Sequence, residues 1–268
     1  MLLSANAFIT KCDELARLGY GAIDVGLTRV IYNNDPYPHD PMLDGDDWRD
    51  ALDGYIKRCR ELGLKIGTTH IPYRYDYTDT ANEKFPFYHK MTVRALQASE
   101  YLGAEWTVLH VRDVKGTVEY AKKLFVDSGV KSIGIAIENM GDLPIDELIE
   151  AHDILKAEGY NVGICLDIGH CHLNGHYIND VPEVILRLGE RIKMLHVHDN
   201  SRGPDMHKAP YMGTIPWAKV MAALKKAGYT GDLNLELQPE LIPEPAREAY
   251  ERYSVDIGNY LISLYENA

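Results

Sequence analysis

The stretch LHVHDNSRGPDMH, residues 195–207, places three histidines and two aspartates within thirteen positions. Imidazole and carboxylate groups can hold a divalent metal ion or transfer protons. They are also common in polar surface loops, so the stretch by itself leaves a metal site, a proton shuttle and a surface loop open. A metal site requires further ligands from elsewhere in the chain. The candidates within the stretch are His196, His198, Asp199, Arg202, Asp205 and His207.

The elements that must position these residues alternate between short apolar runs and longer segments of helical period. Most apolar runs are rich in Ile, Val and Leu, as expected for strands buried on both faces. This alternation predicts a parallel sheet, and eight such units in 268 residues predict a single (β/α)8 TIM barrel that spans residues 1–268. A doubly wound open sheet is the alternative. The expected strands are 2–7, 22–27, 65–71, 106–111, 134–139, 162–168, 192–198 and 233–237, and the clearest helices are 48–63, 91–103 and 144–159.

Six of the expected strands end on a potential metal ligand, which the alternation of side chains along a strand directs toward the barrel axis. The C-terminal ends of parallel barrel strands meet at one face, where the active site forms. Any one of these residues could be an ordinary polar residue, but several carboxylates at one barrel mouth repel unless a cation or a proton holds them. A set of carboxylate and imidazole donors predicts that the bound ion is Mn, Zn, Co or Fe. The six residues are His70, His110, Glu138, Asp167, His196 and Glu236.

The remaining histidines of the chain are less informative. His198 shares the face of His196 beyond the strand end, so it is either an additional ligand or a residue that supports the ligands. Asp199 and Asn200 are expected to shape the following turn. Polar or helical surroundings predict surface positions for His39, His89, His152 and His176.

Composition limits the partners and the compartment. The formal net charge of −12 disfavours nucleic acid and anionic membranes, because it repels both at long range. No apolar run approaches the roughly 20 residues that span a bilayer, and the first fifteen residues turn polar too early for a secretory signal peptide. The four cysteines form no C-x-x-C pair, which favours reduced thiols. We therefore expect a cytoplasmic protein.

Two expected loops border the predicted barrel mouth. Segment 27–48 carries five aspartates against Arg29, the opposite of the basic rim that DNA binding requires. Segment 72–90 is rich in aromatic residues, which predicts either a lid over the site or packing in a homo-oligomer interface. The aspartates are Asp35, Asp40, Asp44, Asp46 and Asp47, and the aromatic residues are Tyr73, Tyr75, Tyr77, Phe85, Phe87 and Tyr88.

The motifs LDIGH (166–170), LHVHDN followed by DMH, and the glutamate of the last strand resemble the xylose isomerase-like TIM barrel family. This family includes sugar and sugar-phosphate isomerases and epimerases and the endonuclease IV group. Its ketose 3-epimerases imply one divalent metal, a substrate held by side chains at the barrel mouth, and a glutamate pair that transfers protons through an enediolate. The implied metal ligands are Glu138, Asp167, His196 and Glu236; the implied substrate-binding residues are His170, Arg202 and His70; and the implied acid–base pair is Glu138 and Glu236.

Two positions depart from the 3-epimerase pattern: Pro144 replaces a second glutamate, and Tyr211 stands where a glycine is common. The endonuclease IV group implies instead a trinuclear zinc phosphodiesterase, and a third alternative is a metal-dependent lyase of 3-keto-glycosides, which the aromatic segment suits. The acidic rim favours an isomerase or epimerase of a small-molecule sugar over an enzyme of nucleic acid. The nine zinc ligands that the second alternative implies are His70, His110, Glu138, Asp167, His170, His196, Asp205, His207 and Glu236.

Overall fold

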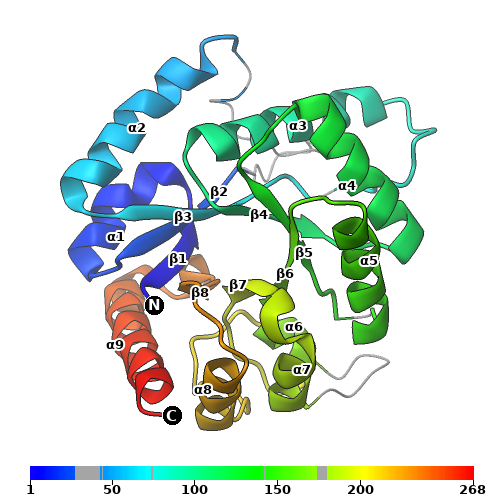
Figure 1. The fold of residues 1–268 in the computed structure, drawn as a ribbon. Coiled ribbons are helices and arrows are strands. Elements are labelled where there is room, and N and C mark those ends of the chain that lie inside the picture. The colour runs from blue at the N-terminus through cyan, green and yellow to red at the C-terminus, as the bar shows by residue number, and fades with distance from the viewer. Residues whose placement is uncertain (28–42, 44, 74, 142, 174–179) are drawn as a thin grey trace.

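Eight parallel strands form a barrel with helices around the outside (Figure 1). The computed structural model describes residues 1–27, 43, 45–73, 75–141, 143–173 and 180–268. The strands are β1 (Leu3–Ala7), β2 (Ala22–Gly26), β3 (Lys65–His70), β4 (Trp106–His110), β5 (Gly134–Glu138), β6 (Val162–Asp167), β7 (Ile192–His196) and β8 (Leu233–Leu235).

The order of the strands confirms the predicted (β/α)8 TIM barrel. Each strand from β1 to β6 pairs in parallel with the next, and β1 also pairs in parallel with β8. The circle closes between β7 and β8, where Val197 forms a parallel bridge with Leu235. Val197 N–H donates to the carbonyl of Asn234 at 2.9 Å, and Glu236 N–H donates to the carbonyl of Val197 at 3.1 Å. The closure therefore fixes Glu236 next to the end of β7.

The helices that surround the barrel mostly follow their strands directly. Several end on glycines with positive φ, such as Gly63 after α2 and Gly129 after α4, as usual for left-handed helix ends. The last helix, α9, packs beside β1 and α1 (Figure 1). The helices are α1 (Cys12–Leu18), α2 (Trp48–Leu62), α3 (Phe85–Tyr101), α4 (Val114–Ser128), α5 (Ile145–Ala157), α6 (Ile168–His172), α7 (Val181–Leu188), α8 (Trp217–Lys226) and α9 (Glu244–Glu266).

Two sequence predictions about the helical layer are wrong. Helix α3 begins at Phe85, six residues before the expected start, so the aromatic segment is not a loop to residue 90. Pro86 is compatible with this because it lies in the first turn, where its missing N–H is not needed. His152 is buried rather than at the surface, because it follows Leu148 by four positions on the core-facing side of α5.

Below the mouth, the barrel interior is apolar on the side of β4 to β7, whereas the polar side chains of Asp24 and Asn234 are buried on the side of β2 and β8. The indole of Trp106 fills the N-terminal end, and Gly134 leaves it room: a Cβ there would lie 2.2 Å from the ring. Above it lies a small buried cluster made of Val108, Ala136, Cys165 and Met194. The next inward residues along these strands are the predicted ligands, so β4 to β7 present their polar groups at the C-terminal mouth.

All four cysteines are buried and free. Among the helices of the described residues, none combines the length and the apolar character needed to cross a bilayer.

Candidate metal centre

The six predicted strand-end residues meet at the C-terminal mouth of the barrel. His70, His110, Glu138, Asp167 and His196 are the last residues of β3 to β7. Glu236 lies one position beyond the end of β8, and its backbone bond to Val197 holds it beside β7. The convergence that the sequence predicted is therefore present in the fold.

A first group of four residues, Glu138, Asp167, His196 and Glu236, offers one ligand atom each within 4.8 Å of the others. His196 lies at its centre, with Nδ1 2.7 Å from Glu138 Oε1 and 3.2 Å from Glu236 Oε2. Asp167 and His196 have no exposed surface, Glu138 is 1% exposed and the side chain of Glu236 is 20% exposed. Three carboxylates and one imidazole in this space match the donors that a first-row divalent cation prefers.

The charges of the first group compensate one another. Burial raises the pKa of Glu138, but the charges of His196 and His110 outweigh it and hold this pKa well below the ordinary value. Burial likewise opposes ionisation of Glu236, and His196 again lowers its pKa. Burial lowers the pKa of His196, but the surrounding carboxylates raise it well above the usual value. Without a metal ion, a proton on His196 therefore takes the place of the cation.

Asp167 is fixed in position by its backbone as well as by its charge. Asn139, directly after β5, donates from Nδ2 to the Asp167 carbonyl at 2.9 Å and accepts from the Asp167 N–H through Oδ1 at 2.7 Å. Oδ1 of Asp167 accepts the backbone N–H of His170 at 2.6 Å and so caps α6. Asn139 was not among the residues predicted from the sequence, although it directly follows the strand-end Glu138.

A second group joins His70 and His110 to the other oxygen of Glu138. His110 Nε2 lies 2.9 Å from Glu138 Oε2, and His70 Nε2 lies 3.8 Å from the same oxygen. Nδ1 of His70 is 2.9 Å from the carbonyl of Ile71, which can only accept, so this nitrogen carries the proton. The unprotonated Nε2 of His70 therefore faces His110 at 3.1 Å. The ring of Tyr73 stacks on His110, with centroids 4.6 Å apart.

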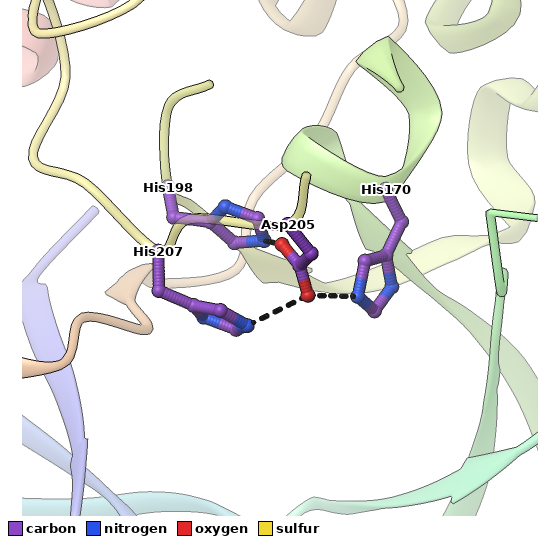
Figure 2. Close-up of side chains that lie close together, drawn as sticks. All are labelled: His170, His198, Asp205 and His207. Atoms are coloured by element: carbon purple, nitrogen blue, oxygen red, sulfur yellow. Dashed lines mark hydrogen bonds and ion pairs between the residues drawn. The ribbon is translucent and has the colours of Figure 1, made fainter. Parts of the chain in front are cut away.

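A third group consists of His170, His198, Asp205 and His207 (Figure 2). Nδ1 of His170 donates to the carbonyl of Asn139 at 3.1 Å, and Nδ1 of His207 donates to the carbonyl of Glu236 at 2.9 Å. Both Nε2 atoms face Asp205 Oδ2, at 3.3 and 3.0 Å (Figure 2). Two imidazole lone pairs and one carboxylate oxygen repel at these distances, so the arrangement requires a proton or a cation between them.

When no ion is present, protonated histidines remove the repulsion between the imidazole lone pairs and the Asp205 carboxylate in the third group. Burial lowers the pKa of His207, but its hydrogen bond to Asp205 and the charge of Glu236 raise the pKa to about 9. Burial also opposes the charged form of His170, and the charges of Asp167 and Asp205 raise its pKa well above the usual value. Asp205 correspondingly has a lowered pKa despite its burial.

His198 connects the first and third groups. Its Nε2 lies 3.1 Å from Asp167 Oδ1 and 3.6 Å from Asp205 Oδ1, and its ring stacks on His207 with centroids 4.1 Å apart. Gly169 leaves space for this ring, because a Cβ at that position would lie 1.9 Å from His198 Cε1. His198 thus lies in the site. Whether it is an additional ligand or a residue that supports the ligands stays a prediction.

The turn after β7 is shaped as predicted. The Asp199 carboxylate accepts from Tyr211 N–H, Ile215 N–H and the indole N–H of Trp217, at 2.9, 3.2 and 2.8 Å. Asn200 donates from Nδ2 to the carbonyl of Gly169 at 2.8 Å and so ties this turn to α6.

Arg202 lies on the same loop, in the left-handed backbone region with φ 61°. It is half-buried beside α6, where its charge adds to burial in lowering the pKa of His172. Its Nη1 is buried and has no hydrogen-bond partner within the part of the chain that the structure describes. Its role as a substrate-binding residue, like those of His70 and His170, stays a prediction.

The aromatic segment is anchored to the barrel rather than free above it. Tyr75 and Tyr77 are buried; the hydroxyl of Tyr75 bonds to that of Tyr120 on α4, and that of Tyr77 donates to the His110 carbonyl at 2.8 Å. These two residues are therefore fixed against β4 and α4, and the lid and the interface both stay predictions for the segment. Of the predicted acidic rim, residues 28–42 and 44 lie outside the described residues, as do His39 and His176. His89, predicted at the surface, is 13% exposed and pairs with Asp127 at 2.7 Å.

One further residue of the barrel interior was missed. Asp24, in the middle of β2, has no exposed surface, and its Oδ2 lies 3.7 Å from His196 Nε2. An aspartate in an otherwise apolar strand could have indicated a functional residue. Asp24 was not selected because the prediction considered only residues at strand ends.

Comparison with known proteins agrees with this fold. The family model described as xylose isomerase-like TIM barrel matches residues 12–253. The chain belongs to this family. Among curated relatives, it is 30% identical over 131 residues to an inosose isomerase of Halalkalibacterium halodurans, an alignment that covers 45% of this chain and 44% of that protein. The chain spans less than two thirds of the length of the curated relatives it matches.

Solved structures of xylose isomerase-like barrels share the fold along nearly the whole chain. A D-tagatose 3-epimerase-like protein superposes with a TM-score of 0.74 at 18% identity, covering 100% of this chain and 99% of its own. An IolI protein with a bound zinc atom superposes with a TM-score of 0.67 at 16% identity, again covering 100% of this chain and 99% of its own. These identities are low enough that they establish the fold alone.

Proposed function

We propose that this protein is a metal-dependent isomerase or epimerase of a small-molecule sugar or sugar derivative. The observation that carries the proposal is the first group: Glu138, Asp167, His196 and Glu236, from four consecutive strands, with ligand atoms within 4.8 Å of one another. Three carboxylates are held this close only when positive charge lies among them. The named activities of the relatives, an inosose isomerase and a 3-epimerase-like protein, support a reaction on a sugar carbonyl. Four buried free cysteines support a cytoplasmic location.

A divalent cation held by these four residues would polarise the substrate carbonyl and stabilise the negative charge of an enediolate. The protein's own part is proton transfer. Glu138 and Glu236 both have lowered pKa values, although burial opposes this, so both are ionised and can act as bases at neutral pH. One glutamate removes the proton from the carbon beside the carbonyl. The other takes up a proton from solvent water and delivers it to the opposite face or to the neighbouring carbon.

The two glutamates differ in their surroundings. Glu138 is almost fully buried, with one oxygen facing His196 and the other facing His110. The side chain of Glu236 is 20% exposed and borders the mouth that a substrate must enter. Glu236 is therefore the more accessible base, and Glu138 is the more rigidly oriented one.

The second and third groups favour one alternative function, a phosphodiesterase of the endonuclease IV type. All nine residues that the resemblance implied as zinc ligands lie in the three groups, and Glu138 is shared by the first two. Three ions there would generate a hydroxide nucleophile and stabilise a phosphodiester transition state. The net charge of −12 opposes approach to nucleic acid, so we place this function second.

Metal content separates the two functions. For protein purified without added metal, elemental mass spectrometry is expected to find about one manganese, cobalt, iron or zinc ion per chain, held by the first group. His196→Gln should remove this ion, whereas Asp205→Asn in the third group should retain it. About three zinc ions per chain would support the phosphodiesterase, and complete absence of metal after reconstitution would contradict both functions.

Metal uptake by the first group is expected to weaken as the pH falls. The carboxylates around His196 raise its pKa well above the ordinary value against the opposing effect of burial, so the imidazole is charged before the ion binds. A cation that binds Nδ1 must displace this proton, and acid therefore favours release of the ion. Each displaced proton lowers the apparent affinity about tenfold per pH unit below the pKa of His196. Calorimetric titrations in buffers of different ionisation enthalpy measure the number of protons released; an affinity independent of pH would contradict this reasoning.

A further inference from the structure

Asp24 is a buried carboxylate for which the proposed reaction has no use. It lies on β2, inside the barrel and below the first group, and it has no exposed surface. Oδ1 accepts from Thr68 Oγ1 at 2.6 Å, and Oδ2 accepts from Asn6 Nδ2 at 2.6 Å and from Asn234 Nδ2 at 3.2 Å. These donors come from β3, β1 and β8, so three strands fix the orientation of one carboxylate.

Such a carboxylate is costly to bury. Removing its charge from water is unfavourable, and neutral donors alone offset this only in part. The group that faces it from the ligand side is the imidazole of His196, whose Nε2 lies 3.7 Å from Asp24 Oδ2. This nitrogen is buried and has no hydrogen-bond partner among the described residues.

The two nitrogens of His196 face different partners. Nδ1 faces Glu138 and Glu236, and Nε2 faces Asp24. A neutral imidazole that offers the Nδ1 lone pair to a cation must carry its proton on Nε2. That proton then points toward the Asp24 carboxylate, whose position is already set by its three donors.

We propose that Asp24 is a positioning residue that accepts the Nε2 proton of His196 and thereby fixes the tautomer and ring orientation that present Nδ1 to the metal ion. The inference rests on the proposed function, because it requires an ion at the first group. Carboxylates that orient a ligating histidine in this way also increase its basicity. The 3.7 Å separation exceeds the usual range of about 2.7–3.2 Å, so a small rotation of the ring or the carboxylate completes the bond.

Zinc affinity, measured by competition with a chelator, tests this role. Asp24→Asn preserves the size of the side chain but removes its charge, and we expect it to raise the zinc Kd about 10–100-fold. Thr68→Val keeps the carboxylate but removes one of its donors, and should give a smaller rise. Ser99→Ala is the control: it removes a buried hydrogen bond to Thr69, 2.7 Å long, without touching His196 or Asp24. It should lower the melting temperature and leave the Kd unchanged.

The tautomer itself gives a readout that loss of stability would not change. In zinc-loaded protein with ¹⁵N-labelled histidine, the parent should show His196 protonated at Nε2, with the signal assigned by its absence in His196→Gln. Asp24→Asn should shift the Nε2–H proton resonance upfield and speed its exchange with solvent, because the charged acceptor is lost, whereas Ser99→Ala should leave both unchanged. An unchanged Kd and an unchanged Nε2 signal in Asp24→Asn would overturn the inference while leaving the metal site in place.

If Asp24→Asn does not fold, Thr68→Val decides alone, and an unchanged Kd there overturns the inference. If instead the parent binds no zinc, or binds only zinc that His196→Gln does not remove, the proposed function fails together with the role of Asp24. The two failures are therefore distinguishable.

Discussion

Glu138→Gln is expected to lower the turnover of a sugar substrate about 10²–10⁴-fold, the usual contribution of a general acid or base. The amide keeps the shape of the side chain but cannot take a proton. It also replaces a charge on which two histidines depend, because His196 Nδ1 lies 2.7 Å from one Glu138 oxygen and His110 Nε2 lies 2.9 Å from the other. We therefore expect a lower kcat together with weaker metal binding. Steady-state kinetics at saturating metal measure the loss of kcat separately from the loss of metal affinity.

Glu236→Gln should cause a loss of similar size, and solvent exchange separates the roles of the two glutamates. In D₂O, the parent should incorporate deuterium at the carbon beside the carbonyl during turnover. Loss of the glutamate that removes the proton should abolish this incorporation. Loss of the glutamate that returns a proton should block net conversion but still allow exchange of the substrate proton.

The matched control is Glu105→Gln. Glu105 directly precedes β4 at the opposite end of the barrel, where it is exposed and forms a 3.2 Å ion pair with Lys65. Exposed pairs of this kind contribute about 0–1 kcal/mol, so this variant should keep full activity. If Glu138→Gln and Glu236→Gln also stay fully active with the ion bound, the proposed acid–base pair is wrong.

The convergence of the candidate ligands at one barrel mouth could be predicted because topology alone produces it. In a parallel barrel every strand ends at the same face, so a polar residue at the end of an apolar strand has a defined place before any side-chain contact is known. Glu138, Asp167 and His196 are at the strand ends where they were predicted, and Glu236 lies at the same mouth although β8 ends one residue earlier. An error of one residue in the predicted end of β8 does not displace Glu236 from the mouth, because its backbone bond to Val197 still holds it there.

Contacts that depend on the register between strands could not be predicted in the same way. Asp24 stands in the middle of β2, and its approach to His196 depends on how the strands are staggered around the barrel. The ring positions of His198 and His207 depend on a loop that places His207 at a positive φ of 41°, which no spacing in the sequence indicates. The early start of α3 was hidden by a proline that ordinarily suggests a loop.

Asp199→Ala is expected to reduce the free energy of unfolding by at least about 3 kcal/mol. The carboxylate accepts three hydrogen bonds in a fully buried position, two from the backbone N–H groups of Tyr211 and Ile215 and one from the indole of Trp217. Hydrogen bonds to a charged group contribute about 1.5–3 kcal/mol each, and the variant leaves all three donors unpaired. Urea unfolding measures the change. Asp199→Asn keeps the size of the side chain and one acceptor oxygen and should cost less, so it provides the graded comparison if Asp199→Ala is insoluble.

The same variant should separate the third group from the first. Asp199 closes the loop between β7 and α8, in which Arg202, His207 and Tyr211 adopt positive φ angles. Such backbone costs about 1–3 kcal/mol per residue and persists only when its surroundings enforce it. With the closure removed, His207 and Asp205 should lose their fixed positions, whereas Glu138 and Asp167 are held by strands. We therefore expect Asp199→Ala to keep the metal ion of the first group and to lose any zinc bound by the third. Stability within about 1 kcal/mol of the parent would show that other contacts hold this loop.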